Sequence, residues 1–218
     1  RQMCIRDREF AKQKGLNILR ENPAFGTVRV LFEDKEIDIA STREEFYPQK
    51  GHLPVVSNIG CALEDDLKRR DFTINAMAYN DSTGLVDEFD GINDLNKGII
   101  RCVGDAKERF TEDALRMMRA IRFSAQLGFD IEENTYNAIS KLSPSISHVS
   151  MERIQVELVK TLLSDNPGYV MRFYETGLFK YVLPDIGRVL GGRYSRNALT
   201  MLKFSKKQPV FRLSLIHI

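Results

Sequence analysis

Tryptophan is absent from the 218 residues, and cysteine and histidine occur three times each. His52, His148 and His217 lie far apart in the sequence, so we expect no histidine-based metal chemistry. The cysteines are scattered as well, and their spacing matches neither a zinc site nor a disulfide framework. A chain without disulfides suits a reducing compartment, and we therefore expect a cytoplasmic location.

Long apolar runs are also missing, because no stretch approaches the roughly 20 apolar residues that span a bilayer. No signal peptide is recognisable. Charged residues make up 28% of the chain and hydrophobic residues 43%, which is typical of a soluble protein with one large or two small domains. We therefore expect no membrane partner.

A strong net charge is missing too, since the formal net charge is only +2. The balance is uneven along the chain, because eight basic residues between positions 180 and 212 face a single acid, Asp185. These basic residues are Lys180, Arg188, Arg193, Arg196, Lys203, Lys206, Lys207 and Arg212. Such a segment is either a solvated face or a contact surface for a phosphate backbone.

The two ends of the sequence are related at the level of DNA. Leu213–Ile218 can be back-translated as CTGTCTCTTATACACATC. The reverse complement of that DNA, read from its second base, encodes Met3–Asp7. This element resembles a transposon-end adapter of sequencing libraries. We interpret residues 1–8 and 213–218 as adapter-derived, and we expect the natural protein to be truncated on both sides.

Strands are predicted only in the first half of the chain. Thr27–Phe32 and Glu36–Ala40 are β-rich runs around a polar turn, which predicts a hairpin. Residues 41–62 contain two prolines and two glycines and are predicted to be a loop. The other expected elements are the tail of a helix over Phe10–Leu19, a helix over Glu64–Ala78, and short strands at Leu85–Phe89 and Ile99–Val103.

From Asp105 onward the pattern is helical. Thr111 is a candidate N-cap for a helix that runs to Gly128, and Gly128 is a candidate C-cap. Ser150 is a candidate N-cap for another helix, and a break is expected at Pro184. The buried stripe of the helix after Ser150 is predicted to be Ile154, Leu158 and Leu162. The predicted fold class is α+β, with a small sheet and helices followed by an all-α part.

The stretch FTEDALRMMRAIRF, Phe110–Phe123, combines an acidic start with an arginine at every third position. The acids are Glu112 and Asp113, and the arginines are Arg116, Arg119 and Arg122. A structural interpretation is available, because acids suit the positive end of a helix and both lie at ion-pair spacing from Arg116. The apolar stripe of this helix is expected to be Leu115, Met118, Ile121 and Ala125.

Nucleotide recognition is the second interpretation of this stretch. Asp113 and Arg116 would place an acceptor beside a planar fork of donors. Cytosine and adenine share an exocyclic amino group next to a bare ring nitrogen, so the Asp could accept from the amine while the Arg donates to the ring. Uracil and guanine would leave buried groups unpaired, at roughly 1–3 kcal/mol each. Arg119 and Arg122 continue the ridge and could hold a triphosphate.

The segment DLKRRDFTINAMAY, Asp66–Tyr79, is the second functional candidate. It can be the start of an amphipathic helix with an Arg–Asp ion pair. In the functional interpretation, Arg70 contacts a nucleotide phosphate, while Asp71 and Asn75 hold the neighbouring backbone.

Three segments together resemble the class II tRNA nucleotidyltransferases and the bacterial poly(A) polymerases. They are LKRRDFTINAMAY, LVDEFDGINDLNKGIIRCVGDAKERFTEDALRMMRAIRFSAQLGF and SMERIQVELVKTLL, and the resemblance runs from about Phe10 to Pro184. It implies an incomplete nucleotidyltransferase head over residues 9–104 and a nucleotide-selecting helical neck over 105–166. The start of a helical, tRNA-binding body is implied over 167–212.

The resemblance also implies roles for individual residues. Arg70 would contact the incoming nucleotide, and Asp113 with Arg116 would form the amino-acid template for C and A. Arg119 and Arg122 would be further nucleotide contacts. Beside these residues, we predict supporting roles for Asp71, Asn75 and Glu112.

One part of the family pattern is missing from the sequence. The family's catalytic strand carries a Gly-Gly-x-Val-Arg-Asp segment and an Asp-x-Asp pair that binds two magnesium ions, and neither occurs here. We expect them upstream of Glu9, and we expect the chain as printed to be inactive. Asp38 is predicted to be a third carboxylate of the metal site, with Glu36 as the alternative. An exposed strand aspartate is the structural explanation of Asp38.

The implied activity is the Mg²⁺-dependent addition of C and A, from CTP and ATP, to the 3′ end of tRNA, held by its acceptor arm. A poly(A) polymerase, or a partial enzyme that adds only A or only CC, would share the Asp–Arg template. A non-catalytic RNA-binding protein is the alternative from another class, and the basic segment after Lys180 suits it.

Overall fold

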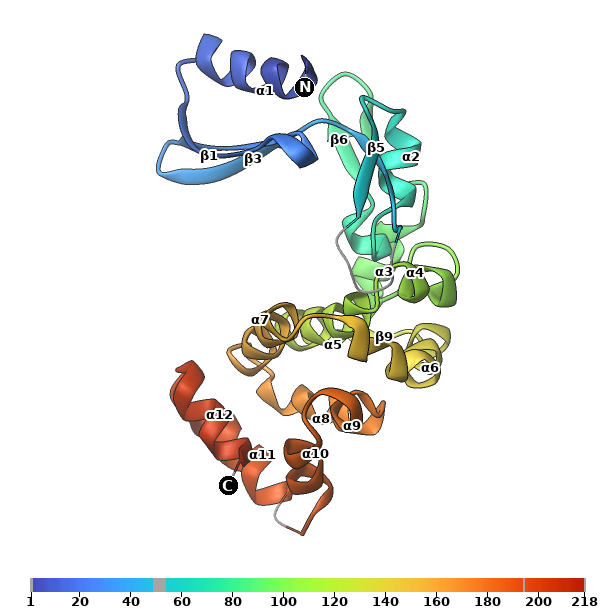
Figure 1. Ribbon diagram of the computed structural model, residues 1–218, viewed down its shortest axis with the longest axis vertical. Helices are drawn as coiled ribbons and strands as arrows, with labels where there is room; N and C mark the ends of the chain where they lie inside the picture. Colours follow the sequence, from blue (N-terminus) through green and yellow to red (C-terminus); the bar gives the residue numbers. More distant parts are fainter. Residues whose placement is uncertain (1, 49–53, 194, 218) are drawn as a thin grey trace. The chain divides into compact units, whose positions relative to one another are not determined.

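The computed structural model describes residues 2–48, 54–193 and 195–217, and Figure 1 shows their helices and strands. The described residues form two compact units. The first unit holds residues up to Pro48 together with Pro54–Arg69, and the second holds the described residues from Arg70 onward. His52 and Gly51, one of the two glycines in the loop predicted over residues 41–62, lie outside the described residues.

The first unit contains a three-stranded antiparallel sheet with the strand order β1-β2-β3. It is formed by β1 (Asn17–Asn22), β2 (Thr27–Phe32) and β3 (Lys35–Ala40), with the 3₁₀ helix η1 (Pro23–Phe25) between β1 and β2. The predicted hairpin is confirmed, and its two-residue turn has positive φ at both Glu33 and Asp34. Helix α1 (Gln2–Gln13) covers the sheet through a small core of Ala11, Val28 and Val30.

Two predictions for this unit are wrong. The helix expected to reach Leu19 ends at Gln13, because Gly15 adopts positive φ and the chain then pairs with β2 as β1. The loop expected over 41–62 contains the antiparallel strands β4 (Arg43–Phe46) and β5 (Val55–Ile59). The prolines of this segment, Pro48 and Pro54, fall between the two strands, where they interrupt no strand hydrogen bond.

The helix expected over Glu64–Ala78 is also shorter than predicted. Helix α2 (Leu63–Lys68) closes the first unit, and the chain continues through an extended Phe72 into the 3₁₀ helix η2 (Thr73–Asn75). The backbone of this segment pairs with the strand region predicted at Ile99–Val103: Thr73 N donates to Arg101 O, and Val103 N donates to Asp71 O. These bonds satisfy the backbone outside a helix, and they place the Arg70–Asp71 motif in an extended segment.

Short elements follow before the helical part. They are β6 (Ala78–Asn80), β7 (Gly84–Val86), α3 (Gly91–Lys97) and β8 (Ile99–Ile100). Asp87 caps α3 by accepting from the backbone N–H groups of Gly91 and Ile92. Gly91 allows a close approach, because a Cβ there would lie 2.4 Å from the carbonyl oxygen of Thr73.

The rest of the second unit is helical apart from β9 (Asp130–Ile131), which pairs in parallel with β8 and is a strand that the sequence did not predict. The α-helices are α4 (Ala106–Glu112), α5 (Leu115–Leu127), α6 (Glu133–Leu142), α7 (Met151–Leu162), α8 (Met171–Glu175), α9 (Leu178–Val182), α10 (Pro184–Gly191), α11 (Ser195–Phe204) and α12 (Pro209–His217). The 3₁₀ helices are η3 (Ser143–His148) and η4 (Pro167–Val170). The predicted α+β fold class is confirmed, as is the break before Pro184.

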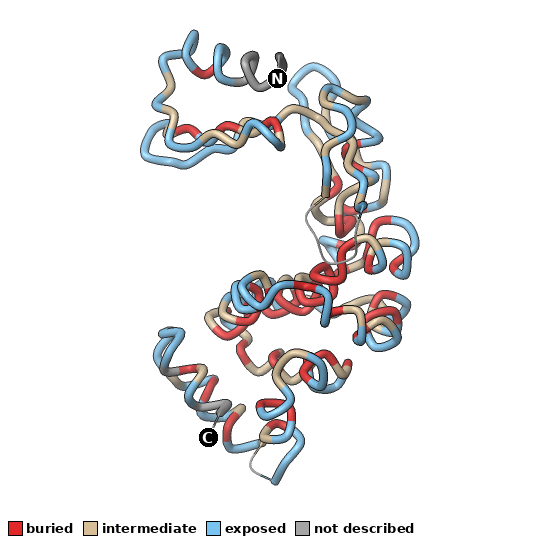
Figure 2. The backbone as a smooth tube through the Cα atoms, in the orientation of Figure 1, coloured by how far each residue is buried: buried red, intermediate tan, exposed pale blue. Residues whose placement is uncertain are grey.

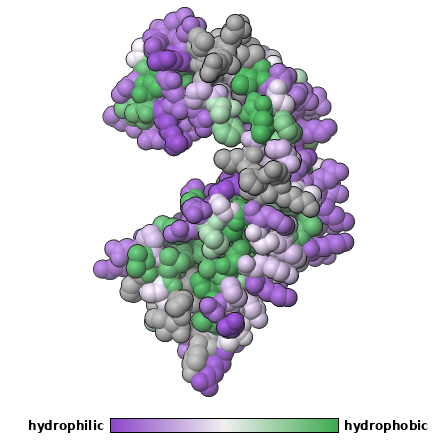
Figure 3. All heavy atoms as spheres, viewed as in Figure 1, coloured by the Kyte–Doolittle hydropathy of each residue, from purple (hydrophilic) through white to green (hydrophobic). Residues whose placement is uncertain are grey.

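The main core of the second unit lies where α5 and α7 pack together, and Figure 2 shows buried residues along α5. The predicted stripes are confirmed: Leu115, Met118, Ile121 and Ala125 are buried on α5, and Ile154, Leu158 and Leu162 on α7. The predicted C-cap is confirmed as well, since Gly128 has φ 72°. Apolar residues gather over the helical part on the face drawn in Figure 3.

Candidate nucleotide-binding site

The stretch from Phe110 to Phe123 is two helices and not one. Helix α4 ends at Glu112, and α5 begins at Leu115. Asp113 has the extended torsion angles φ −138° and ψ 103°, and its Oδ1 accepts from the backbone N–H of Leu115 at 3.1 Å. Asp113 thus satisfies a free N–H group at the start of α5. The predicted cap Thr111 is wrong, because Thr111 lies inside α4, which Asp105 caps instead.

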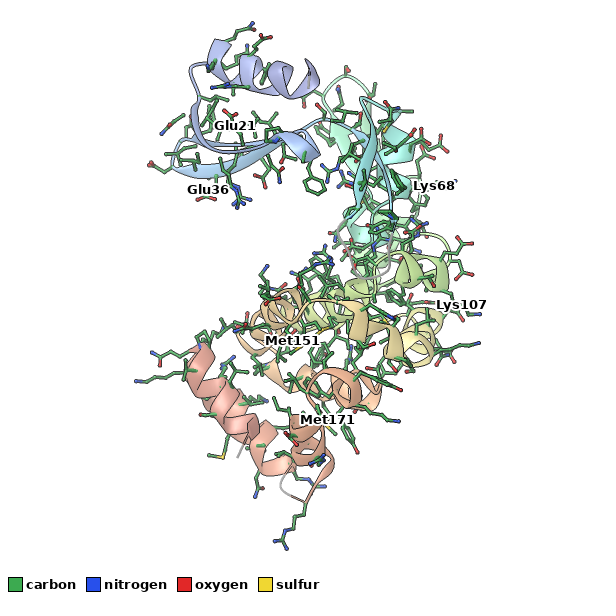
Figure 4. The ribbon with its side chains drawn as sticks, viewed as in Figure 1. Glu21, Glu36, Lys68, Lys107, Met151 and Met171 are labelled. Atoms are coloured by element: carbon green, nitrogen blue, oxygen red, sulfur yellow. The ribbon has the colours of Figure 1, made fainter. Side chains whose placement is uncertain are left out.

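The second oxygen of Asp113 is held from another helix. Arg153, near the start of α7, donates from Nη2 to Asp113 Oδ2 at 2.8 Å. Residue Asp113 is buried, with 7% of its surface exposed. The carboxylate orientation is therefore fixed on both sides. Figure 4 labels Met151 at the start of α7, two positions before Arg153.

Arg116 lies at the start of α5 and is held by α4. Its Nη1 contacts Glu112 Oε2 at 2.6 Å and the carbonyl oxygen of Arg109 at 3.2 Å. The predicted ion pair between Glu112 and Arg116 is confirmed, although Glu112 ends one helix and Arg116 begins the next. Glu112 also accepts from Arg109 at 2.5 Å, so this carboxylate joins two arginines.

Asp71 connects the Arg70–Asp71 motif to α5. Its Oδ2 accepts from Arg119 Nε at 2.7 Å and lies 2.6 Å from Arg119 Nη2. Its Oδ1 accepts from the backbone N–H of Phe72 at 3.0 Å and from Asn75 Nδ2 at 3.3 Å. Arg70 donates to the carbonyl oxygen of Asn75 at 3.0 Å. The Arg70–Asp71 motif is therefore bonded to α5, the helix that carries the predicted nucleotide-binding arginines.

Arg122, the last arginine of the ridge, lies in a buried ion pair. Its Nε is 2.6 Å from Glu157 Oε2 on α7, and its Nη1 donates to Gln126 Oε1 at 2.8 Å. The two side chains are only 9% and 6% exposed. Burial lowers the pKa of the Arg122 guanidinium, and the charge of Glu157 opposes that shift.

The second unit thus gathers most of the predicted site residues through the contacts described above. Six arginines and four carboxylates take part, which leaves an excess of two positive charges. The arginines are Arg70, Arg109, Arg116, Arg119, Arg122 and Arg153, and the carboxylates are Asp71, Glu112, Asp113 and Glu157. Such a cluster is suited to an anion with several oxygens, such as a phosphate chain.

Asp38, by contrast, belongs to the first unit and is bound to a neighbour on β2. Arg29 donates from Nε to Oδ1 at 2.7 Å and from Nη2 to Oδ2 at 2.8 Å. This hydrogen-bonded pairing lowers the pKa of the Asp38 carboxyl group. Glu36, labelled in Figure 4, also contacts Arg29, at 3.2 Å. Among the residues that the structure describes, no group of three or more His, Cys, Asp or Glu could hold a metal ion.

The basic segment after Lys180 is not a uniform solvated face. Arg212 is 2% exposed and donates to the carbonyl oxygens of Leu162 and Ser164. Lys207 forms an ion pair with Asp165. Lys180 and Lys203 lie exposed on α9 and α11, and Lys206 lies exposed in the connection between α11 and α12. No helix among residues 2–48, 54–193 and 195–217 is long and apolar enough to cross a membrane.

Arg153 and Glu157 are the site residues that the sequence analysis missed. They lie four positions apart on α7, and each binds a residue of the predicted set, Asp113 and Arg122 respectively. The available signal was their i,i+4 spacing beside the predicted apolar stripe of this helix, which places both on one side of it.

Comparison with known proteins agrees with this layout. The model of the poly A polymerase head domain matches residues 5–101, and that of a probable RNA and SrmB-binding site of polymerase A matches residues 128–190. The chain is 48% identical over 157 residues to a CCA-adding enzyme of Ligilactobacillus salivarius, an alignment that covers 72% of this chain and 39% of that protein. The chain therefore spans about two fifths of the length of this curated relative.

Solved structures have the same fold. A Bacillus stearothermophilus CCA-adding enzyme in complex with CTP is 31% identical, with a TM-score of 0.67 over 93% of this chain and 52% of that one. A CCA-adding enzyme with ATP is 26% identical, with a TM-score of 0.72 over 98% of this chain and 50% of that one.

The matched family models define the class of the chain: a poly A polymerase head-domain sequence followed by a helical segment of the same family, with the fold of the solved structures. The chain belongs to the family of the CCA-adding enzymes and poly(A) polymerases.

Proposed function

We propose that the protein to which this chain belongs adds C and A, from CTP and ATP, to the 3′ end of tRNA without a nucleic-acid template. The observation that carries the proposal is the fixed carboxylate of Asp113 directly before the helix that bears Arg116, Arg119 and Arg122. The names of the matched relatives and structures support the same activity and the same two nucleotides.

Base selection follows from the groups at the start of α5. Each oxygen of a carboxylate has two lone pairs, so Asp113 can accept from a base amino group and keep its bonds to Leu115 and Arg153. Arg116 supplies donors for the ring nitrogen beside that amino group. Cytosine and adenine satisfy both residues, whereas uracil and guanine present the opposite order of donors and acceptors.

Phosphate binding falls to the arginines along the same ridge. Arg119 and Arg70 are tied to the Asp71 segment, and Arg122 is tied to α7, so the guanidinium groups are held in place before a ligand binds. A preorganised cationic cluster binds the triphosphate without first ordering long side chains. The excess positive charge of the cluster also suits an RNA backbone.

The family implies that magnesium assists the transfer of the nucleotidyl group. The described residues offer no group of ligands that could hold the ion, and both oxygens of Asp38 are bound by Arg29. The residues described therefore do not fit a magnesium site. The role of Asp38 as a third carboxylate of the metal site stays a prediction.

Two alternatives share parts of this site. A poly(A) polymerase, or an enzyme that adds only A or only CC, would use the same Asp113–Arg116 pair, and the match to a poly A polymerase head domain favours it. An RNA-binding protein without catalysis is favoured by the match to a probable RNA-binding segment and by the exposed lysines after Lys180.

The test uses protein made from the complete source gene, tRNA that lacks its 3′ CCA, magnesium and labelled CTP or ATP. We expect incorporation of C and then A, and none from UTP or GTP. Long A tails would favour the poly(A) polymerase. Salt-sensitive tRNA binding without incorporation would reject the enzyme in favour of the RNA-binding protein.

A further inference from the structure

Phe123 lies against both outer arginines of the ridge on α5. The Arg122 Cζ atom is 3.8 Å from the centroid of the Phe123 ring, and the Arg119 Cζ atom is 5.4 Å from it. Both distances are within the range in which a guanidinium is attracted to the electron-rich face of an aromatic ring. One ring thus attracts two guanidinium groups that repel each other.

The Phe123 ring is itself fixed by the Arg70–Asp71 motif. Phe72, which is fully buried, packs against Phe123 with ring centroids 5.7 Å apart and an interplanar angle of 79°. This edge-to-face geometry is a favourable arrangement for an aromatic pair. The ring is therefore held by the residue that follows Asp71, the carboxylate partner of Arg119.

Asp71 and Glu157 occupy some of the N–H groups of Arg119 and Arg122, so that only the remaining N–H groups can bind a ligand. Arg119 Nε donates to Asp71, and its Nη2 lies 2.6 Å from the same oxygen. Arg122 Nη1 donates to Gln126, while its Nε lies 2.6 Å from Glu157 Oε2 as an ion pair without hydrogen-bond geometry. Among the described residues, Arg119 Nη1 and Arg122 Nη2 take part in none of these contacts. The direction of these two groups depends on the planes of the guanidinium groups, which the ring restricts.

We propose that Phe123 is a positioning residue for nucleotide binding, which sets the directions in which Arg119 and Arg122 meet the triphosphate. This proposal rests on the proposed function, because the ligand is the nucleotide of that same site. Phe123 acts through the arginines and makes no contact of its own with the base. Its effect is therefore confined to the phosphate part of the ligand.

The test measures binding of ATP and of adenosine to the full 218-residue chain by calorimetry, for the wild type, Phe123→Leu and Phe123→Tyr. Leucine fills a similar space without an aromatic face, and tyrosine keeps the face. We expect Phe123→Leu to raise the Kd for ATP about fivefold, in line with a cation–π contribution near 1 kcal/mol, and to leave the Kd for adenosine unchanged. Phe123→Tyr should bind ATP within about twofold of the wild type.

Equal weakening of ATP and adenosine by Phe123→Leu would mean that Phe123 is an ordinary packing residue and would overturn the proposal. Unchanged ATP binding would overturn it as well. Circular dichroism of each variant establishes that the fold is kept.

A second measurement separates this proposal from the proposed function. The side-chain Nε–H NMR signals of Arg119 and Arg122 report the surroundings of both groups without any nucleotide. We expect both signals to shift in Phe123→Leu and to stay near their wild-type positions in Phe123→Tyr. Wild-type chain that binds neither ATP nor CTP would contradict the proposed function, whereas unmoved arginine signals in Phe123→Leu would contradict the positioning role.

Discussion

Arg153 and Asp113, which are 40 residues apart in the sequence, are joined by a hydrogen bond of 2.8 Å between α7 and the start of α5. Because the other carboxylate oxygen of Asp113 accepts from Leu115, the acceptor proposed to recognise the base cannot rotate freely. Preorganisation of this kind contributes to specificity, since the wrong base cannot be accommodated by turning the side chain.

Replacing Arg153 should therefore weaken base selection. We expect Arg153→Ala to lower the preference of the chain for CTP over UTP about fivefold, because the lost hydrogen bond is worth about 1 kcal/mol. The measurement is the pair of dissociation constants. Arg153→Lys, which keeps the charge but not the planar fork, is the matched control. Its preference for CTP over UTP should lie between those of the wild type and of Arg153→Ala.

Arg153→Ala could keep the wild-type preference for CTP while its circular dichroism spectrum stays native. That result would show that Arg153 does not orient the Asp113 carboxylate.

Removing one partner of the buried pair of Arg122 and Glu157 should lower the free energy of unfolding strongly, whereas replacing both partners by apolar residues should change it little. We expect Arg122→Met to lower the free energy of unfolding by about 3 kcal/mol, because it leaves the Glu157 carboxylate buried without its partner. The double variant with Met at both positions should recover most of that loss. Urea unfolding followed by circular dichroism measures both. A double variant no more stable than Arg122→Met would contradict this account of the pair.

The same arginine has an expected effect on the ligand. Arg122→Ala should weaken binding of all four nucleoside triphosphates while the order of preference among them is kept. Competition binding at a temperature where the variant remains folded tests this. If the variant changed the base preference and kept the affinity, Arg122 would not be a phosphate contact.

Cys102 should be nearly inert to alkylation in the folded chain. Burial raises the pKa of its thiol to about 12, so at pH 8 the protonated form dominates and the reactive thiolate is scarce. We expect iodoacetamide to label Cys102 at least about tenfold more slowly in the folded chain than in urea. Mass spectrometry of the peptides distinguishes it from Cys61, which is only half-buried. Equally fast labelling in both states would contradict the packing around Cys102.

Apolar periodicity predicted the helical part of the fold well, because the stripes on α5 and α7 are packed against each other. The strands β1 and β4 were missed, since NILREN and REEF are polar and show no alternation that a half-buried strand would need. Their pairing is set by partners elsewhere in the chain.

The candidate site was predicted in composition but not in geometry. Asp113 was expected inside a helix, since the residues around it are compatible with one, and only its capping bond and the contact to Arg153 explain the break. Contacts between distant segments, such as the one from Asp71 to Arg119, leave no local signal in a single sequence. The predicted domain boundaries after residues 104 and 166 stay predictions.

The central claim is that Asp113 selects the base, and the most direct measurement is the set of dissociation constants of CTP, ATP, UTP and GTP for the wild-type chain and for Asp113→Ala. We predict that the wild type prefers CTP and ATP by roughly fivefold or more, since the wrong base leaves a buried group unpaired. The variant should bind all four nucleotides within about threefold of one another. A folded variant that retains the wild-type preference for CTP and ATP would contradict the claim.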